Sequence, residues 1–324
     1  MREITYRDAL REALQEEMRR DERVFLLGED IANYGGAFKV TQGFVEEFGE
    51  KRIKDTPLAE SVIVGASVGA AIVGMRPVPE IMFADFLAIA MDHIVNSAAK
   101  MRYMYGGKAN VPIVIRAPQG AGTSSGAHHC QSVEGWLMNI PGIKIVMPST
   151  PHDAKGLLKA SIRDNNPVVF LEHKLLYATK GTVLKEEYII PLGKADIKRE
   201  GNDVTIIATS LMVKKALRAA EEMEKEGISI EVVDPRTLKP LDEETLINSV
   251  CKTKRVLIVH EACLTGGPGA EIAAILAQKT FDYLDAPIER IGAPDIPVPF
   301  SPPMEKFFIP DEKRIIEAVK KLLA

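Results

Sequence analysis

The stretch GIKIVMPSTPHDAKGLLKASIRDNNPVVFLEHK, residues 142–174, contains two apolar runs on either side of an amphipathic segment. The runs 142–149 and 167–174 are short and rich in Val and Ile, as buried strands are, whereas 152–165 has helical spacing. Short apolar strands that alternate with helices are typical of a parallel sheet covered on both faces. The stretch therefore predicts an α/β fold.

The same alternation continues on both sides of this stretch. Further strands are expected at 24–30, 76–83 and 111–118, and helices at 5–19 (with Thr5 as its cap), 44–49, from Glu60, from about 86 to 105 and at 131–140. A second series has expected strands at 203–210, 228–237, 255–262 and 286–293, and helices at 212–227, 269–284 and 311–323. Between the two series the residues are mixed and polar. We therefore predict a first domain over 1–185, a linker over 186–202 and a second domain over 203–324.

Composition gives no support to several classes of function. The chain has 324 residues, 46% of them hydrophobic, and a net charge of −4, so it has no electrostatic footprint for nucleic acid or an anionic membrane. Its three cysteines form neither a paired framework nor a CxxC, and no four-ligand zinc pattern is present. The first residues lack an apolar signal core, so we expect a cytoplasmic protein.

The stretch VIVGASVGAAIVGM (62–75) is apolar but too short to span a bilayer. Its small residues recur at roughly helical spacing; they are Gly65, Ala66, Gly69, Ala70 and Gly74. This pattern predicts a fully buried helix that allows close backbone approach. A helix that is apolar on all sides needs cover on all sides, and another subunit is one source of that cover.

The segment GAHHCQS (126–132) follows a glycine-rich stretch and suggests three chemistries: a metal site, a Cys–His nucleophile or an imidazole proton shuttle. Adjacent His128 and His129 rarely bind one ion, and no further ligand lies at a suitable spacing. Adjacency of His129 and Cys130 does not provide the geometry of a nucleophile and its base either. From spacing alone, a helix N-terminus with exposed imidazoles remains an equally good interpretation.

Two other positions are candidates for chemistry. Glu60 begins the most apolar expected helix, where it is either a capping acid favoured by the helix dipole or a carboxyl group in a dry interface. Burial would raise the pKa of such a group and let it share a proton with a ligand nitrogen. The segment LTGGPGAE (264–271) looks like a phosphate loop but fits neither glycine pattern for phosphates, and a glycine turn into a helix explains it equally well.

Seven segments, spread over nearly the whole chain, resemble one protein family. They are LGEDIANYGGAFKVTQG, DTPLAESVIVGASVGAAIVGMRPVPEIMF, NSAAKMRYMYGGK, HCQS, NIPGIKIVMPSTPHDAKGLLKASIRDNNPVVF, VDPRTLKPLD and HEACLTGGPGAEIA. The family is the beta subunit of the thiamine-diphosphate-dependent dehydrogenase component of 2-oxo acid dehydrogenase complexes. The resemblance implies a transketolase-like fold, with a thiamine-diphosphate (pyrimidine)-binding domain followed by a transketolase C-terminal domain.

The resemblance assigns roles to residues of this chain. Glu60 matches the glutamate that contacts N1′ of the cofactor aminopyrimidine, Leu58 a residue that shapes the bent cofactor, and Phe86 the aromatic that packs on the ring. Met82 is also placed at the cofactor, where family members often carry glutamine. His129 matches the catalytic histidine, which would act as a general acid and orient the lipoyl dithiolane or the reaction intermediate.

Two residues beside His129 depart from the family pattern. Cys130 replaces the usual serine of His-Ser-Gln, and His128 replaces a residue that is often glutamine or tyrosine. Both changes are expected to tune substrate choice. The family also holds a structural monovalent cation, usually potassium, largely through backbone carbonyls. The matching positions are Ile113, Ser161, Ile162, Asp164 and Asn166.

The resemblance also implies partners. The family's magnesium-diphosphate motif begins Gly-Asp-Gly, which this chain lacks. A separate alpha subunit is therefore expected to bind the diphosphate and magnesium in an α2β2 heterotetramer. The small-residue helix after Glu60 is an expected interface element, and the second domain is the expected dock for a lipoyl acyltransferase core.

The sequence leaves more than one substrate and more than one function in competition. The segments YMYGGKANVPIVIR (103–116) and EHKLLY (172–177) look closer to acetoin-cleaving members than to branched-chain ones, with pyruvate close behind. A docking subunit without catalytic residues is an alternative of another class, which the presence of both Glu60 and His129 opposes. A self-sufficient transketolase-type enzyme is a third, which the missing diphosphate motif and the chain length oppose.

Overall fold

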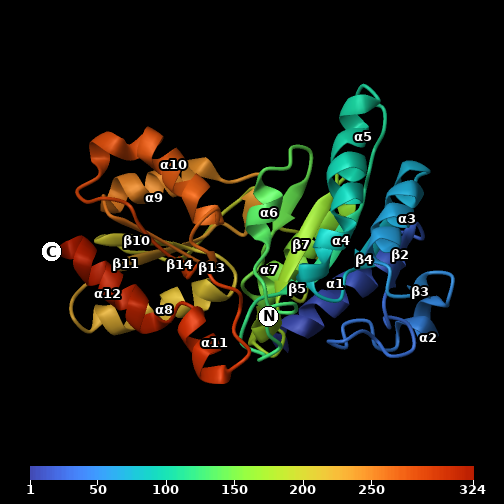
Figure 1. Ribbon diagram of the computed structural model, residues 1–324, viewed down its shortest axis with the longest axis horizontal. Helices are drawn as coiled ribbons and strands as arrows, with labels where there is room; N and C mark the ends of the chain where they lie inside the picture. Colours follow the sequence, from blue (N-terminus) through green and yellow to red (C-terminus); the bar gives the residue numbers. More distant parts are fainter. The chain divides into compact units, whose positions relative to one another are not determined.

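A computed structural model describes all residues, 1–324, and the chain forms two compact units (Figure 1). The first unit contains Met1–Gln119 and Asn139–Leu192, and the second contains Gly120–Met138 and Gly193–Ala324. The division at 186–202 remains a prediction. It does not anticipate that 120–138 belongs with the carboxyl-terminal residues.

The first unit is built on parallel strands, in the order β6-β7-β5-β4-β2-β3. Their bounds are β2 (Val24–Gly28), β3 (Ile53–Asp55), β4 (Arg76–Glu80), β5 (Val114–Gln119), β6 (Lys144–Val146) and β7 (Val168–His173). The strands β2, β5 and β7 are buried along their whole length, which explains why they read as continuous apolar runs. The prediction of a parallel α/β sheet is confirmed.

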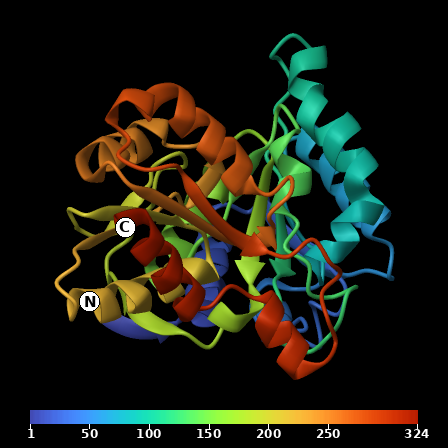
Figure 2. The ribbon, with the colours of Figure 1, turned by 60° about the vertical axis from the view of Figure 1, so that its left-hand side comes forward.

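Helices cover both faces of this sheet, with α1 packed against α7 on one side and α3 against α4 on the other (Figures 1 and 2). The bounds are α1 (Tyr6–Arg20), α2 (Phe44–Phe48), α3 (Glu60–Ile72), α4 (Leu87–Asp92), α5 (Ala99–Met104) and α7 (Pro151–Arg163). Thr5 caps α1, since its hydroxyl accepts a bond of 3.1 Å from the Asp8 amide. The expected single helix from 86 to 105 is interrupted by a π-helical segment, His93–Ala98, between α4 and α5. A short antiparallel pair, β1 (Arg2–Thr5) and β8 (Lys180–Val183), completes the unit.

This chain alone covers only one side of the helix α3, so the expected full burial would need another subunit and stays a prediction. Ile63, Val64 and Val68 are buried, whereas Val62 is 65% and Val73 is 80% exposed. The small residues permit close packing on one side only: a Cβ at Gly65 would lie 3.0 Å from the His93 ring. The opposite, apolar side of α3 has no cover from this chain.

The second unit contains a sheet in the order β14-β13-β10-β11-β9, parallel except for β9. Its helices α9 and α10 lie on one face of the sheet, and α8 and α12 on the other (Figure 2). The bounds are α6 (Glu134–Met138), β9 (Asp196–Arg199), β10 (Val204–Ala208), α8 (Leu211–Glu224), β11 (Ile230–Asp234), β12 (Thr237–Lys239), α9 (Glu243–Thr253), β13 (Val256–Cys263), α10 (Pro268–Thr280), β14 (Glu289–Ala293), α11 (Pro302–Phe308) and α12 (Glu312–Leu323). No helix in the chain has the length and apolarity needed to cross a membrane.

A buried ion cluster joins three central strands of the first sheet. Arg116 on β5 is 1% exposed and donates from Nε and Nη2 to the Glu172 carboxylate on β7, at 2.7 and 2.8 Å. It also donates from Nη1 to Glu80 on β4, at 2.5 Å. The Tyr177 hydroxyl donates to Glu172 at 2.6 Å. These contacts satisfy charges that would be very costly if left unpaired in the protein interior.

Replacing Arg116 with methionine is expected to lower the free energy of unfolding by about 3–5 kcal/mol, because it leaves two buried carboxylates without a counter-charge. The measurement is urea unfolding followed by circular dichroism. Lys225→Ala is the control, since its 2.8 Å pair with Glu222 is exposed and such pairs contribute about 0.5 kcal/mol. A loss for Arg116→Met no larger than that of the control would contradict the role given to the cluster.

Candidate active site

The predicted cofactor residues of the first unit come from connections at one edge of its sheet. Gly28 is aligned with Asp55 on one side and with Glu80 on the other, so β2, β3 and β4 end together. Leu58 and Glu60 follow β3, and Met82 and Phe86 follow β4. The carboxyl ends of parallel strands are where ligands bind in open α/β sheets. The structure therefore brings these four residues to the carboxyl end of the strands, where a ligand would bind.

Glu60 is the first residue of α3, and its side chain is buried. The helix N-terminus favours a negative charge there. Glu29, which follows β2, is also buried, and its Oε1 atom has no hydrogen-bond partner. Burial, together with repulsion from Glu60 and Asp30, raises the pKa of Glu29 to about 7. A carboxyl group such as Glu29, whose pKa lies near neutral pH, is suited to exchange protons with a bound ligand.

Four aromatic rings form a chain of contacts that begins at Phe86, after β4. Phe86 packs edge-on against Phe83 at a centroid distance of 6.2 Å, and Phe83 packs edge-on against Phe38 at 6.1 Å. Phe38 in turn stacks on Tyr177 at 4.8 Å. Phe86 and Met82 are both half-buried. They offer apolar surface at which a flat ring can pack.

Leu58 is 82% exposed, so nothing in this chain covers it. A large apolar side chain in such a position is available to a ligand or to another chain.

His129 lies in the second unit, in the loop between β5 and α6. His129 is half-buried, His128 is exposed and Cys130 is buried. The Cys130 sulfur lies 3.5 Å from the Thr123 hydroxyl. No group of three or more His, Cys, Asp or Glu side chains is arranged to hold a metal ion. His129 and Glu60 belong to different units.

The glycine segment LTGGPGAE forms a turn into α10, with Gly267 as the cap and Pro268 at the first helical position. The Thr265 amide and hydroxyl donate to the Asp295 carboxylate, at 3.2 and 2.6 Å. This segment, with Trp136 and Glu261, lines a hollow of about 360 Å³. Because a carboxylate from this chain already accepts from the loop, nothing here favours a phosphate.

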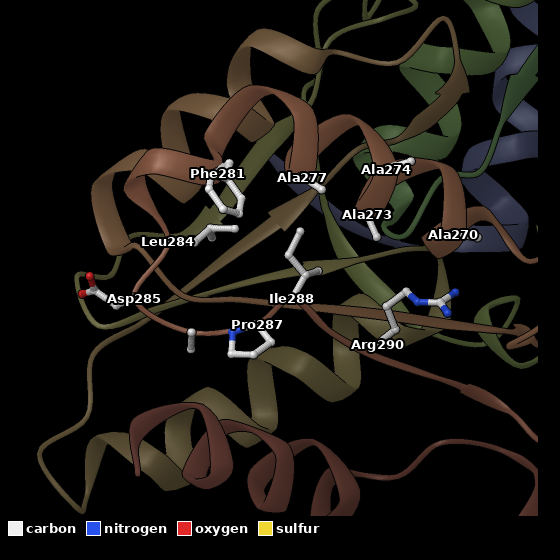
Figure 3. Close-up of a pocket in the computed structure, with 11 residues that line it drawn as sticks. Ala270, Ala273, Ala274, Ala277, Phe281, Leu284, Asp285, Pro287, Ile288 and Arg290 are labelled. Atoms are coloured by element: carbon white, nitrogen blue, oxygen red, sulfur yellow. The ribbon is translucent and has the colours of Figure 1, made fainter.

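A second hollow in the same unit, of about 950 Å³, lies between α10 and the edge strand β14 (Figure 3). Its walls are apolar, and the helix contributes four alanines; they are Ala270, Ala273, Ala274 and Ala277. The charged side chains at this hollow are Asp285 and Arg290. It contains no nucleophile and no general acid or base of the predicted set, so the candidate chemistry lies elsewhere.

The five positions expected at a cation lie around the end of α7 and the start of β5. Arg76 already donates from Nη1 to the Ile162 and Asp164 carbonyl oxygens, at 2.9 and 3.0 Å. Burial alone would raise the pKa of Asp164, but hydrogen bonds from Lys144 and Asn166 hold it below its ordinary range. Each carbonyl keeps a second lone pair, so the oxygens fit a cation ligand set beside the arginine.

Glu29 was not singled out by the sequence analysis. Its signal was present, because it directly follows the buried strand VFLLG at the edge where ligands bind. What the sequence did not reveal is that Glu29 and Glu60 lie close enough to repel each other, since β2 and α3 are separated by more than thirty residues.

Glu29→Gln is expected to remove a pH dependence of stability. The folded protein holds a proton on Glu29 between the ordinary pKa of 4.5 and about 7, so stability falls as pH rises through this window and is constant above it. At pH 8 the variant should exceed the wild type by about 1–3 kcal/mol, and at pH 4 the two should agree. Thermal unfolding of the cofactor-free protein from pH 4 to 8 measures this. Parallel curves for the two proteins would argue against a shifted Glu29.

Comparison with known protein families gives two matches that together cover most of the chain. Residues 2–180 match the transketolase pyrimidine-binding domain, and residues 193–315 match the transketolase C-terminal domain. Among solved structures, a chain described as a split-gene transketolase, inactive beta4 tetramer, superposes with a TM-score of 0.82. It is 25% identical, with 99% of this chain and 98% of that chain covered.

Three curated relatives span nearly the full length. The chain is 51% identical to the 2-oxoisovalerate dehydrogenase subunit beta of Bacillus subtilis, with 98% of each chain covered. It is 50% identical to the pyruvate dehydrogenase E1 component subunit beta of Rickettsia felis, and 48% identical to the acetoin:2,6-dichlorophenolindophenol oxidoreductase subunit beta of Bacillus subtilis. Each match covers 99% of this chain and 98% of the relative. The chain therefore belongs to the transketolase-like beta subunits of thiamine-dependent 2-oxo acid and acetoin dehydrogenases.

Proposed function

We propose that this chain, with an alpha subunit, forms a thiamine-diphosphate-dependent dehydrogenase component that acts on pyruvate or acetoin. The component passes the acyl group to a lipoyl acyltransferase. The observation that carries the proposal is the buried Glu60 carboxylate at the first turn of α3, beside Glu29 with its pKa raised to about 7. A dry pair of carboxyl groups that holds a proton fits the ring nitrogen of an aminopyrimidine.

When bound, thiamine diphosphate supplies an electron sink for cleavage next to a carbonyl group. Glu60, buried at the first turn of α3, would share a proton with N1′ of the aminopyrimidine. Phe86 and Met82 would pack against the ring, and Leu58 would help to shape the bent cofactor. The side chains of this edge therefore orient the cofactor, exclude water from it and hold one proton at a defined atom.

His129 would serve as the general acid toward the substrate or the lipoyl group. An imidazole suits this task because its ordinary pKa is near neutral pH. Its place in a loop next to glycines and serines leaves its ring half-buried, which permits contact with a ligand. Cys130, which stands where the family usually has serine, is buried and would act through packing.

An alpha subunit would supply what this chain lacks. The sequence contains no Gly-Asp-Gly, so the diphosphate and its magnesium would be held by the alpha chain in an α2β2 heterotetramer. The uncovered apolar side of α3, with Val62 and Val73, supports a contact with another chain at this helix. The acyltransferase core would dock on the second domain.

Three substrates remain in competition. Relatives named for 2-oxoisovalerate, pyruvate and acetoin are 51%, 50% and 48% identical to this chain, so overall identity does not separate them. The first of these values supports a branched-chain 2-oxo acid dehydrogenase beta subunit as a second candidate. A docking subunit without catalytic residues would require that Glu60 and His129 have no role in turnover.

Potassium is proposed at the carbonyl oxygens near the end of α7. The helix C-terminus is a negative dipole end, which attracts a cation. The Arg76 guanidinium occupies one side of the Ile162 and Asp164 carbonyls, and a potassium ion would use the other. The two cations would then share these oxygens rather than replace each other.

Glu60→Gln and His129→Ala are expected to lower kcat by about 10²–10⁴-fold, because each removes a group that holds or donates a proton. The measurement is thiamine-dependent reduction of an artificial acceptor after co-expression with an alpha chain. Pyruvate, acetoin and branched-chain 2-oxo acids are tested in parallel. Glu50→Gln is the control for charge removal, since Glu50 is exposed.

A clear preference for one substrate that requires both chains would identify the substrate and support the shared site. Undiminished activity of both variants would instead favour the docking subunit. Activity of this chain alone would favour a self-sufficient enzyme.

Potassium is expected to raise the thermal stability of the protein. At a potassium concentration about 100-fold above its Kd, the folded state gains about 2.7 kcal/mol. Melting temperatures in potassium chloride, sodium chloride and choline chloride at equal ionic strength measure this gain. Equal values in potassium and choline would remove the cation from the proposal.

A further inference from the structure

The loop that carries His129 has a strained backbone. Residues 120–132, here termed the histidine loop, contain four positions with positive φ: Gly120 at 94°, Gly122 at 107°, Ser124 at 52° and Gly126 at 74°. Ser124 has a side chain, and a residue other than glycine adopts this region only at a cost in backbone strain. Such a conformation persists only where the surrounding structure enforces it. The question is what holds the histidine loop.

A carboxylate from far along the chain binds this loop. Glu305, on α11, is 3% exposed. Its Oε1 accepts from the Gly122 amide at 2.7 Å, and its Oε2 accepts from the Ser124 amide at 3.0 Å and from the Ser124 hydroxyl at 3.2 Å. The alternating positive φ values turn neighbouring amides toward one point, which forms a concave anion-binding nest. The bonds are charge-assisted and therefore roughly twice as strong as neutral ones.

A second buried carboxylate binds both ends of the same loop. Glu261, at the end of the sheet in β13, accepts from the Ala121 amide at 2.7 Å and from the Ser132 hydroxyl at 3.1 Å. Phe300 covers the middle of the loop, since a Cβ at Gly126 would lie 2.3 Å from its ring. Glu261 of the sheet therefore holds the start and the end of the loop. Phe300 and Glu305, which precede α12, hold its middle.

The element that carries Glu305 is itself well anchored. The helix α11 begins with proline and ends with the buried Phe308, and the buried Ile309 follows it. The Lys215 ammonium of α8 donates to the Pro310 carbonyl at 2.6 Å. These contacts anchor the element that carries Glu305, so the carboxylate is placed to hold the loop.

We propose that Glu305 is a positioning residue for His129: its carboxylate fills the amide nest of the histidine loop and holds the imidazole where it transfers a proton. This inference rests on the proposed function, which gives His129 its role. Glu305 itself need not contact substrate or cofactor. A misplacement of about 1 Å at a reacting group can lower a rate by about 10²-fold, so loss of the nest contact should appear in kcat.

The test uses the assembled alpha–beta enzyme and the variants Glu305→Ala, Glu305→Gln and His129→Ala. Glu305→Ala is expected to lower kcat by about 10–100-fold with KM changed less than about threefold. In the His129→Ala background, Glu305→Ala should lower kcat by less than about twofold further, because a residue that acts through another has nothing left to position. Glu305→Gln keeps an acceptor oxygen and should fall between Glu305→Ala and the wild type.

Two further readouts separate positioning from loss of fold. Hydrogen exchange in Glu305→Ala should accelerate at the amides of 121–126 and remain unchanged in α8 and α10. Acetate matches the deleted group, so it should restore part of the kcat of Glu305→Ala, measured against its effect on the wild type. Glu312→Ala is the matched control, because Glu312 lies in the same terminal segment and pairs with exposed Arg218 at 3.3 Å.

The outcomes distinguish the catalytic role of His129 from the positioning role of Glu305. Full activity of His129→Ala would overturn the proposed role of His129, whereas exchange of 121–126 would still report whether Glu305 holds the loop. Full activity of Glu305→Ala beside an inactive His129→Ala would overturn the positioning role alone. The positioning role would also be overturned if Glu305→Ala lowered kcat equally in the wild-type and His129→Ala backgrounds. Unchanged hydrogen exchange in the histidine loop would overturn it as well.

Discussion

The Arg116 guanidinium, buried between Glu80 and Glu172, is the interaction on which the first unit depends. It ties together β4, β5 and β7 at the end of the sheet where the candidate cofactor residues gather. Burial raises the pKa of Glu80, and only the paired guanidinium offsets the cost of its charge. A sheet edge closed by such a cluster can present other acidic groups nearby without unfolding around them. The cluster therefore provides a rigid, polar base for the connections that carry Glu29 and Glu60.

The sequence predicts the central strands of the first sheet because they are buried on both faces, whereas the short and mostly exposed β3 was not predicted. The runs 24–30, 111–118 and 167–174 read as strands, and each overlaps an observed one. The sequence is less informative where the pattern depends on context. The strand β9 lies within the polar segment expected to be a linker, because an edge strand needs only one apolar face. One side of α3 is exposed in this chain, since composition indicates that a helix requires cover but not which chain supplies it.

For the candidate site, the resemblance to a family assigned Glu60, Phe86 and His129, and the structure places the first two at one sheet edge. Residue patterns alone did not decide whether each of these residues has a structural or a chemical role. Neither approach identified Glu29 or Glu305. Their importance comes from neighbours that are distant in sequence: Glu305 binds an amide 183 residues away. Local periodicity contains no information on such contacts, and strained positions such as Ser124 become visible only in the backbone itself.

Buried carboxyl groups act in two opposite ways in this chain, and the difference lies in their donors. Glu305 and Glu261 each accept several hydrogen bonds from the histidine loop, so their charge is satisfied and they hold backbone in place. Glu29 has an oxygen without any donor and an acidic neighbour, so its pKa rises and a proton is retained. In this chain the donors around Glu305 and Glu261 suit these carboxylates to holding backbone in place. Glu29, with an oxygen that lacks a donor and with an acidic neighbour, is instead suited to proton exchange.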